Sequence, residues 1–141
     1  MRILFACVGN SCRSQMAEAF CRALSNDVEC ESAGSNPAQS VAPHAIEVMK
    51  EIGIDISRAR TKGFRDVTAG GFDYMVSMGC TVTCPFIPGA KEVHWEIPDP
   101  YGKGIKDYRH VRDLIRSEVA GLLTRLGYLA SGLHDNHQPL A

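Results

Sequence analysis

The sequence has no long hydrophobic run and no excess of charge of either sign. No apolar stretch approaches the roughly 18 residues that a membrane-spanning helix needs. The net charge of −1 gives no general attraction to nucleic acid or to an anionic membrane. The first residues, MRILFACVGN, contain a short apolar run but lack the cleavage pattern of a secretory signal peptide. These features predict a cytoplasmic protein that has neither a membrane nor a nucleic acid as its partner.

The six cysteines also lack the patterns that most often explain cysteine in a protein. They form no CxxC pair, and no histidine lies near any of them at the usual zinc spacings. Disulfide frameworks belong mainly to small secreted chains, whereas a chain of 141 residues can bury a core without them. We therefore expect thiol chemistry at a few of the cysteines, packing at the others, and no metal or other cofactor. The cysteines are Cys7, Cys12, Cys21, Cys30, Cys80 and Cys84.

Short apolar runs alternate with segments of helical period along the chain. The predicted strands are 2–7, 27–34, 72–79 and 91–97, and the predicted helices are 14–25, 41–53 and 105–129. Such alternation predicts an α/β fold with a parallel sheet covered on both faces, which makes three layers. We expect one domain over 1–129 and a loose tail over 130–141. Ligands of such sheets bind at the carboxyl ends of the strands.

The loop between the first strand and the first helix combines a thiol with a fixed positive charge. Cys7 closes the strand and Arg13 precedes the helix, and between them lie Val8, Gly9, Asn10, Ser11 and Cys12. Amide groups of such a loop can surround a tetrahedral oxyanion, and the helix N-terminus adds partial positive charge. The Arg13 guanidinium can hold two oxygens at once, and the same field favours a reactive thiolate at Cys7. The nucleotide-binding pattern G-x-x-x-x-G-K-S/T is absent. The alternative interpretation is an ordinary turn with a buried cysteine and a surface arginine.

The stretch CVGNSCRSQMAEAF, together with SAGS at 32–35 and DP at 99–100, resembles the low-molecular-weight protein tyrosine phosphatase superfamily. The resemblance covers about 1–128 and implies a four-stranded parallel sheet of flavodoxin-like topology flanked by helices. It also implies a role for each matching residue. Cys7 is then the nucleophile, and Arg13 binds the oxyanion together with the amides of residues 8–14. Ser14, with Asn10, positions the loop and stabilises the thiolate.

Asp99 is the general acid that the resemblance implies. Elementary chemistry favours the same residue, because Asp99 stands between Pro98 and Pro100 in a stiff loop and a departing oxygen needs a proton. Without the Cys7 loop, a simple turn aspartate would be the better interpretation.

A second informative stretch is VSMGCTVTCPFIPG, which follows the third predicted strand. Its Cys80 and Cys84 stand at the strand's carboxyl end, an edge that a parallel sheet shares with Cys7. The stretch closely resembles the arsenate reductases of this superfamily that thioredoxin recycles. The resemblance implies a relay in which Cys7 attacks arsenate, Cys80 then forms a disulfide with Cys7, and Cys84 takes over the oxidation from Cys80. Thioredoxin or another thiol reductant would be the partner, and phosphate and sulfate would compete with arsenate.

Some features depart from these relatives or leave other functions open. Thr81, Val82 and Thr83 replace the small or acidic residues that many relatives carry between the two cysteines, and only Tyr101 follows the DP pair where phosphatases tend to have two tyrosines. A phosphatase that hydrolyses phosphate monoesters through Cys7 is the second reading. An oxyanion-binding or redox-sensing module without turnover is the third.

The remaining residues of interest are expected to be structural. We expect Cys12, Cys21 and Cys30 to be packed in the core. Glu18 and Ser32 match positions that bind potassium in some arsenate reductases, but Lys62 stands where a further acidic ligand would be needed. We therefore predict no metal there.

Overall fold

A computed structural model describes residues 1–67, 71–79 and 85–129 of the chain. Cys80, Cys84 and the predicted tail at 130–141 lie outside the described residues. The elements in chain order are β1 (Arg2–Cys7), α1 (Arg13–Leu24), β2 (Glu29–Gly34), α2 (Pro43–Lys50), the 3-10 turn η1 (Phe64–Asp66), β3 (Tyr74–Ser77), β4 (Lys91–His94) and α3 (Ile105–Leu126). The four strands form one parallel sheet in the order β2-β1-β3-β4. This confirms the predicted four-stranded parallel α/β fold.

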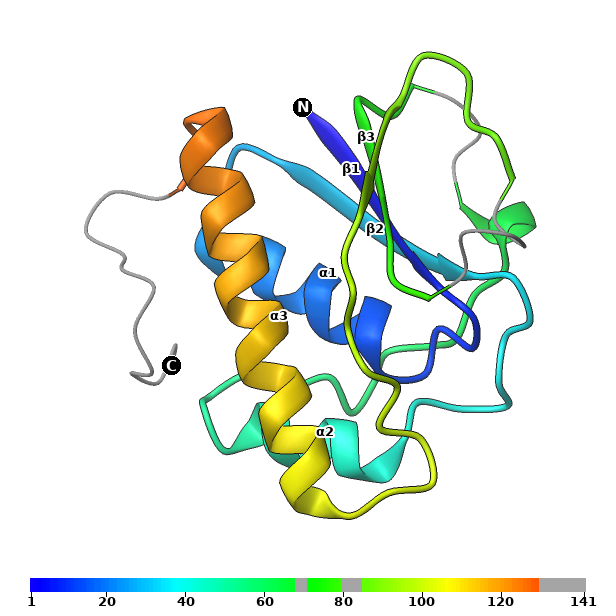
Figure 1. The fold of residues 1–141 in the computed structure, drawn as a ribbon, viewed down its shortest axis with the longest axis vertical. Coiled ribbons are helices and arrows are strands. Elements are labelled where there is room, and N and C mark those ends of the chain that lie inside the picture. Colours follow the sequence, from blue (N-terminus) through cyan, green and yellow to red (C-terminus); the bar gives the residue numbers. More distant parts are fainter. Residues whose placement is uncertain (68–70, 80–84, 130–141) are drawn as a thin grey trace.

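The sheet separates a large core from a small one. Side chains of β1 alternate between them, because successive residues of a strand point to opposite faces: Ile3 and Phe5 belong to the large core and Leu4 to the small one. Figure 1 shows α1 and α3 on one side of the sheet, where they cover the large core. In the described residues the small core is covered by η1 and the chain around it rather than by an α-helix. The third layer is therefore thinner than the sequence predicts.

Several elements are shorter than predicted, and their ends have local causes. Pro43 occupies the first turn of α2, where its missing N–H is not needed, so the helix begins there rather than at residue 41. Gly127 adopts a left-handed conformation with φ of 78° and ends α3. Among the described residues, no helix combines the length and the apolar character that crossing a membrane requires.

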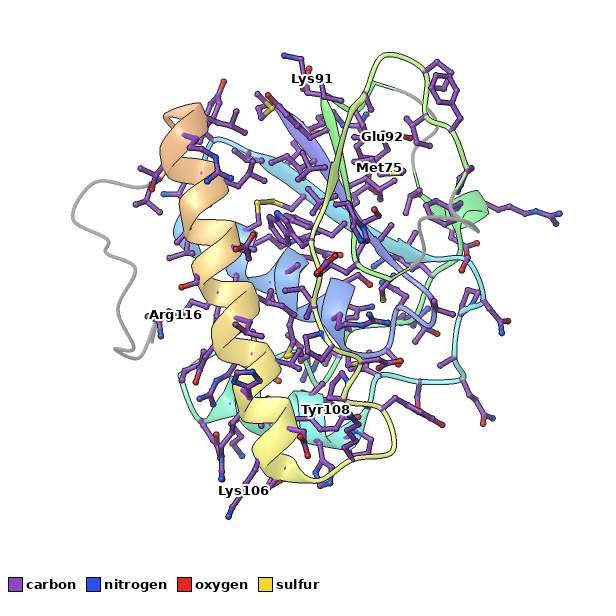
Figure 2. All side chains as sticks on the ribbon, in the orientation of Figure 1. Met75, Lys91, Glu92, Lys106, Tyr108 and Arg116 are labelled. Carbon is purple, nitrogen blue, oxygen red and sulfur yellow. A yellow bond between two sulfur atoms is a disulfide. The ribbon has the colours of Figure 1, made fainter. Side chains whose placement is uncertain are left out.

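A disulfide joins α1 to β2 inside the large core. It links Cys21 to Cys30, which are 0% and 4% exposed, and is visible as the yellow bond in Figure 2. The burial confirms the prediction that both residues belong to the core. The bond between them is a further finding that the sequence does not predict. The reason is tertiary: α1 packs directly on β2, which brings the two Cα atoms to 6.5 Å, within the range that a disulfide needs.

Candidate active site

The loop from Cys7 to Arg13 is held from outside by the chain that follows β2. The carbonyl oxygens of the loop accept hydrogen bonds from the backbone N–H groups of that chain: Ser35 to Cys7, Asn36 to Val8, Ala38 to Gly9 and Ala42 to Ser11, at 2.8 to 3.2 Å. Because these carbonyl groups point toward the outer segment, we expect the amide groups of the loop to line its concave side. Gly34 makes the close approach possible, since a Cβ there would lie 2.5 Å from the Val8 oxygen.

Asn10 is the centre of the hydrogen bonds that shape this loop. It is fully buried and adopts a left-handed conformation with φ of 50°, which asparagine tolerates better than most residues. Its Nδ2 donates to Ser14 Oγ at 2.8 Å. Its Oδ1 accepts from Gln15 Nε2 at 2.9 Å and from the Lys62 amide at 2.8 Å. The side chain thereby connects the loop to α1 and to the segment before η1.

Ser14 extends this arrangement to the Cys7 thiol. Its Oγ lies 2.8 Å from Cys7 Sγ. Because the same oxygen already accepts a hydrogen bond from Asn10, its hydroxyl proton is free to point at the sulfur. A hydrogen bond donated to sulfur stabilises the thiolate. These contacts agree with the positioning roles that the family resemblance implied for Asn10 and Ser14.

Arg13 lies between two chain segments at the carboxyl edge of the sheet. Its Nη1 donates to the Ile97 carbonyl at 3.1 Å, and its Nη2 lies 3.5 Å from Asp99 Oδ2. Its buried Nε has no hydrogen-bond partner among the described residues. Gly79 allows the guanidinium to sit here, because a Cβ on Gly79 would come within 2.5 Å of Nη1. The guanidinium is thus fixed beside the Cys7 loop rather than extended into solvent.

One cavity of about 270 Å³ brings the predicted site residues together. Its lining residues are Cys7, Val8, Gly9, Ser11, Cys12, Arg13, Asn36, Pro37, Ala38, Asp99 and Tyr101. The Asp99 side chain is 52% exposed, and its Oδ1 accepts a hydrogen bond from the Tyr101 amide at 3.0 Å. A carboxyl group, a thiol and a guanidinium therefore share one concave space. Trp95, by contrast, does not line this cavity and packs against Phe5 in the core.

Cys12 is buried, as predicted, but it is also part of the cavity wall. Its Sγ lies 3.9 Å from Asp99 Oδ1. Burial, together with the nearby Cys7 and Asp99, raises the pKa of the Cys12 thiol from 9.0 to about 11. At neutral pH Cys12 is therefore a neutral thiol.

Two residues that hold the loop were missed or only partly recognised in the sequence. Gln15 links Asn10 to the carbonyl oxygen of Arg60 at 2.8 Å, and no pattern in the sequence pointed to it. For Lys62 the sequence indicates only that it does not suit a metal ion. Its Nζ lies 3.3 Å from Glu18 Oε1 and 3.5 Å from Ser32 Oγ. Lys62 therefore connects the Asn10 side chain to both α1 and β2.

Cys80 and Cys84 lie outside the described residues, although Gly79, the chain neighbour of Cys80, packs on Arg13. Within the described ranges, no group of three or more His, Cys, Asp and Glu residues is arranged to hold a metal ion.

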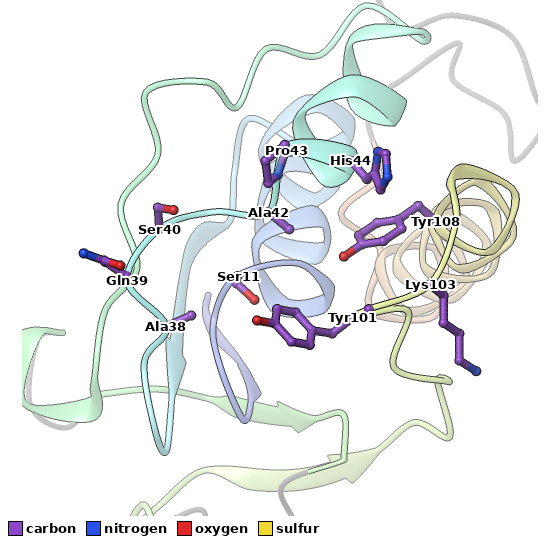
Figure 3. Close-up of a pocket in the computed structure, with 11 residues that line it drawn as sticks. Ser11, Ala38, Gln39, Ser40, Ala42, Pro43, His44, Tyr101, Lys103 and Tyr108 are labelled. Carbon is purple, nitrogen blue, oxygen red and sulfur yellow. The ribbon is translucent and has the colours of Figure 1, made fainter.

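A second and larger cavity of about 580 Å³ adjoins the first and shares Ser11, Ala38 and Tyr101 with it. Figure 3 shows its walls, which come from the chain after β2, the start of α2, the chain after Asp99 and the first turn of α3. The further lining residues are Gln39, Ser40, Ala42, Pro43, His44, Gly102, Lys103 and Tyr108.

Comparison with known proteins finds relatives along nearly the whole chain. The profile of the family described as "Low molecular weight phosphotyrosine protein phosphatase" matches residues 2–130. An arsenate reductase of Staphylococcus aureus (strain Newman) is 38% identical over 127 residues, which cover 87% of this chain and 96% of the relative.

Two solved structures extend these findings. A crystal structure of an arsenate reductase from Archaeoglobus fulgidus is 29% identical with a TM-score of 0.77, and the match covers 86% of this chain and 98% of that chain. A thioredoxin-dependent arsenate reductase of Corynebacterium glutamicum is 32% identical with a TM-score of 0.73, and the match covers 89% of this chain and 61% of that one.

Proposed function

Because the chain belongs to the low molecular weight phosphotyrosine protein phosphatase family, we propose that it is an arsenate reductase that uses Cys7 as its nucleophile. The observation that carries this proposal is the cavity in which Cys7, Arg13 and Asp99 meet. The similarity to arsenate reductases, one of them thioredoxin-dependent, supports arsenate as the substrate.

The first half of the reaction uses described residues. Arg13 and the loop amides bind the arsenate oxygens, and Ser14 stabilises the Cys7 thiolate at 2.8 Å. The sulfur attacks arsenic, an arsenic–oxygen bond breaks, and Asp99 gives its proton to the departing oxygen. The product of this step is a Cys7–arsenic adduct.

The second half requires a second thiol. The Cys80 thiolate attacks the Cys7 sulfur, the sulfur–arsenic electron pair stays on arsenic, and arsenite leaves. The two electrons come from two thiols, which become the Cys7–Cys80 disulfide. Cys84 then attacks Cys80, frees Cys7 and leaves a Cys80–Cys84 disulfide for thioredoxin or another thiol reductant. Support for this step comes from Gly79, which lies against Arg13 and directly precedes Cys80.

A phosphatase is the second candidate, because the family description names that activity and the same cavity suits phosphate. A phosphatase needs only Cys7, Arg13 and Asp99 and has no use for Cys80 or Cys84. Only one tyrosine, Tyr101, follows the DP pair, and its ring is largely exposed. This arrangement supports a small inorganic oxyanion better than phosphotyrosine.

The deciding experiment is an arsenate reduction assay with thioredoxin, comparing the wild type with Cys7→Ser, Cys80→Ser and Cys84→Ser. We expect no turnover from Cys7→Ser or Cys80→Ser. Cys84→Ser should stop after one turnover as a Cys7–Cys80 disulfide, which peptide mapping detects. Repeated turnover by Cys84→Ser would refute the relay. Hydrolysis of an aryl phosphate at rates rivalling arsenate reduction would favour the phosphatase.

A further inference from the structure

The cavity of about 580 Å³ has the character of an anion site. Among the described residues that line it there is no aspartate or glutamate, and Lys103 is the one permanently charged side chain. The other polar groups of the lining are hydroxyls, an amide and the imidazole of His44. A single positive charge among neutral donors suits a ligand group with a single negative charge.

The hydroxyl of Tyr108 is aimed into this cavity. The residue is 3% exposed, yet its hydroxyl makes no hydrogen bond to any residue that the structure describes. Figure 3 shows it directed from α3 toward the space beside Ala42 and Tyr101. The hydroxyl oxygen is not one of the fully enclosed atoms that lack a partner. It is therefore reached from the cavity, and a ligand that accepts from it gains a hydrogen bond with a held donor. Burial, with the charges of Cys12, Asp99 and Tyr101 nearby, raises the pKa of Tyr108 to about 12. The hydroxyl therefore remains a donor at neutral pH.

The N-terminus of α2 opens onto the same cavity. Ala42 precedes the helix and provides no side-chain cap, and Pro43 has no N–H to donate. The amide groups of His44 and Ala45 in the first turn are thus not capped by the preceding side chain, and the helix dipole adds partial positive charge at this end. Tyr108 lies close to the N-terminus of α2, since the rings of His44 and Tyr108 meet edge to face with their centroids 5.3 Å apart.

We propose that this cavity is a carboxylate-binding subsite, so that the protein binds small molecules carrying an oxyanion in the Cys7 cavity and a carboxylate beside Tyr108. The carboxylate accepts from the Tyr108 hydroxyl and from the first amides of α2, and Lys103 balances its charge. Both cavities share Ser11 and Tyr101, so one ligand reaches from one into the other. The proposal rests on the oxyanion site of the proposed function and adds to it a second point of recognition.

The test measures binding directly by calorimetry, without any reaction. The probes are phosphonoacetate, 3-phosphonopropionate and 4-phosphonobutyrate, and each is compared with the alkylphosphonate of the same length, which lacks the carboxylate. We expect the carboxylate of the best-fitting probe to improve affinity about tenfold, as for a hydrogen bond to a charged group. Inorganic phosphate serves as the reference for the Cys7 cavity alone.

Variants then show which residues provide the gain in affinity from the carboxylate. Tyr108→Phe keeps the ring and should remove most of the tenfold advantage while leaving the affinity for phosphate unchanged. Lys103→Gln, at an exposed position, should also reduce the affinity advantage of the carboxylated probe over its alkylphosphonate. This variant tests the subsite if Tyr108→Phe does not fold. Tyr74→Phe in β3, which lines neither cavity, is the matched control.

The outcomes separate the two proposals. The subsite is refuted if phosphate binds but no probe exceeds its alkylphosphonate, or if the advantage persists in both Tyr108→Phe and Lys103→Gln. If phosphate and every phosphonate fail to bind, the oxyanion site of the proposed function is wrong and the subsite falls with it. If phosphate binds and arsenate is not reduced, the reductase proposal fails while the subsite is still decided by the probes.

Discussion

At the scale of single residues, the surroundings of the Cys7 thiol are shaped by hydrogen bonds that begin far from the sulfur. Ser14 contacts the sulfur, Asn10 orients Ser14, and the amide of Lys62 holds Asn10 from 52 positions along the chain. Asn10 and Ser14 are fully buried, and a buried polar network is rigid when every member is satisfied. The loop is therefore shaped before a ligand arrives.

Lys62 should matter more for activity than an ordinary surface lysine. The substitution keeps the backbone amide that binds Asn10 but removes the Nζ contacts with Glu18 and Ser32 that hold this segment in place. We therefore expect Lys62→Gln to lower kcat/KM for arsenate about tenfold, because small displacements of positioning groups are costly. The matched control is Arg22→Gln, which removes the other cation on Glu18, at 2.9 Å, from a side chain that is 63% exposed. The control should stay near wild-type activity. Steady-state kinetics measure the activity of both variants, and urea unfolding measures their stability. Equal losses in the two variants would contradict a specific role for Lys62.

Cys12 provides a pH-dependent signature of burial. Its pKa is about 11 in the folded protein against an ordinary 9.0. Between these values the unfolded chain has lost the thiol proton and the folded chain has kept it. The unfolding free energy therefore falls as pH rises through this window, by on the order of 2 kcal/mol.

Urea unfolding between about pH 8 and about pH 10.5 measures this fall in unfolding free energy, because that range covers most of the interval between the two pKa values of Cys12. The Cys12→Ala variant should show a flatter dependence on pH than the wild type. Parallel curves for the two proteins would show that Cys12 ionises as readily when folded as when unfolded.

At the scale of elements, the end of β3 shapes the site as much as the loop after β1 does. Gly79 has φ of 85° and leaves no room for a Cβ beside Arg13. Gly89 has nearly the same backbone conformation, φ of 83°, but a Cβ there would meet nothing within 4 Å. A side chain at either glycine would strain the backbone, but only a side chain at Gly79 would also displace the Arg13 guanidinium.

Alanine at each position tests this difference. Both Gly79→Ala and Gly89→Ala should lose about 1–2 kcal/mol of stability, the cost of a left-handed residue with a side chain. Only Gly79→Ala should weaken phosphate binding and arsenate turnover, by about 100-fold, because it moves Arg13. Thermal unfolding and kcat/KM measure the two effects, and similar activity in both variants would refute the role of Gly79.

The element boundaries show where prediction from sequence ends. The sequence predicts the strand over 2–7 with its observed bounds, because β1 is buried and apolar from its second residue to its last. The fourth strand was predicted over 91–97, but β4 ends at His94. It is an edge strand that pairs with β3 alone, and β3 offers only four partners. Its length is therefore set by a neighbour and not by its own residues.

At the scale of the whole molecule, the Cys21–Cys30 disulfide ties the helical layer to the sheet. It closes a short loop with a sequence separation of 9. A cross-link of this size removes chain entropy from the unfolded state worth about 2–3 kcal/mol. We expect the oxidised protein to be more stable than the reduced protein by that amount in urea unfolding.

The variant with Cys21→Ala and Cys30→Ala is the control for this comparison. Its stability should respond to reductant less than that of the wild type by this amount, because the Cys21–Cys30 cross-link is absent in both conditions. A wild type whose unfolding midpoint is the same with and without reductant would contradict the cross-link. Counting free thiols before and after denaturation gives an independent check.

The sequence by itself determined the order of the elements and predicted which residues carry the chemistry. The Cys7–Arg13 loop, Asp99 between two prolines, and the alternation of strands and helices are local patterns, and local patterns depend on neighbouring residues alone. Only the tertiary structure decided which distant residues serve the loop. The Lys62 amide on Asn10, Gly79 under Arg13, the Cys21–Cys30 bond and the cavity beside Tyr108 all join segments far apart in the chain. Such contacts depend on how helices and strands cross one another, and that crossing is set by packing of the whole core.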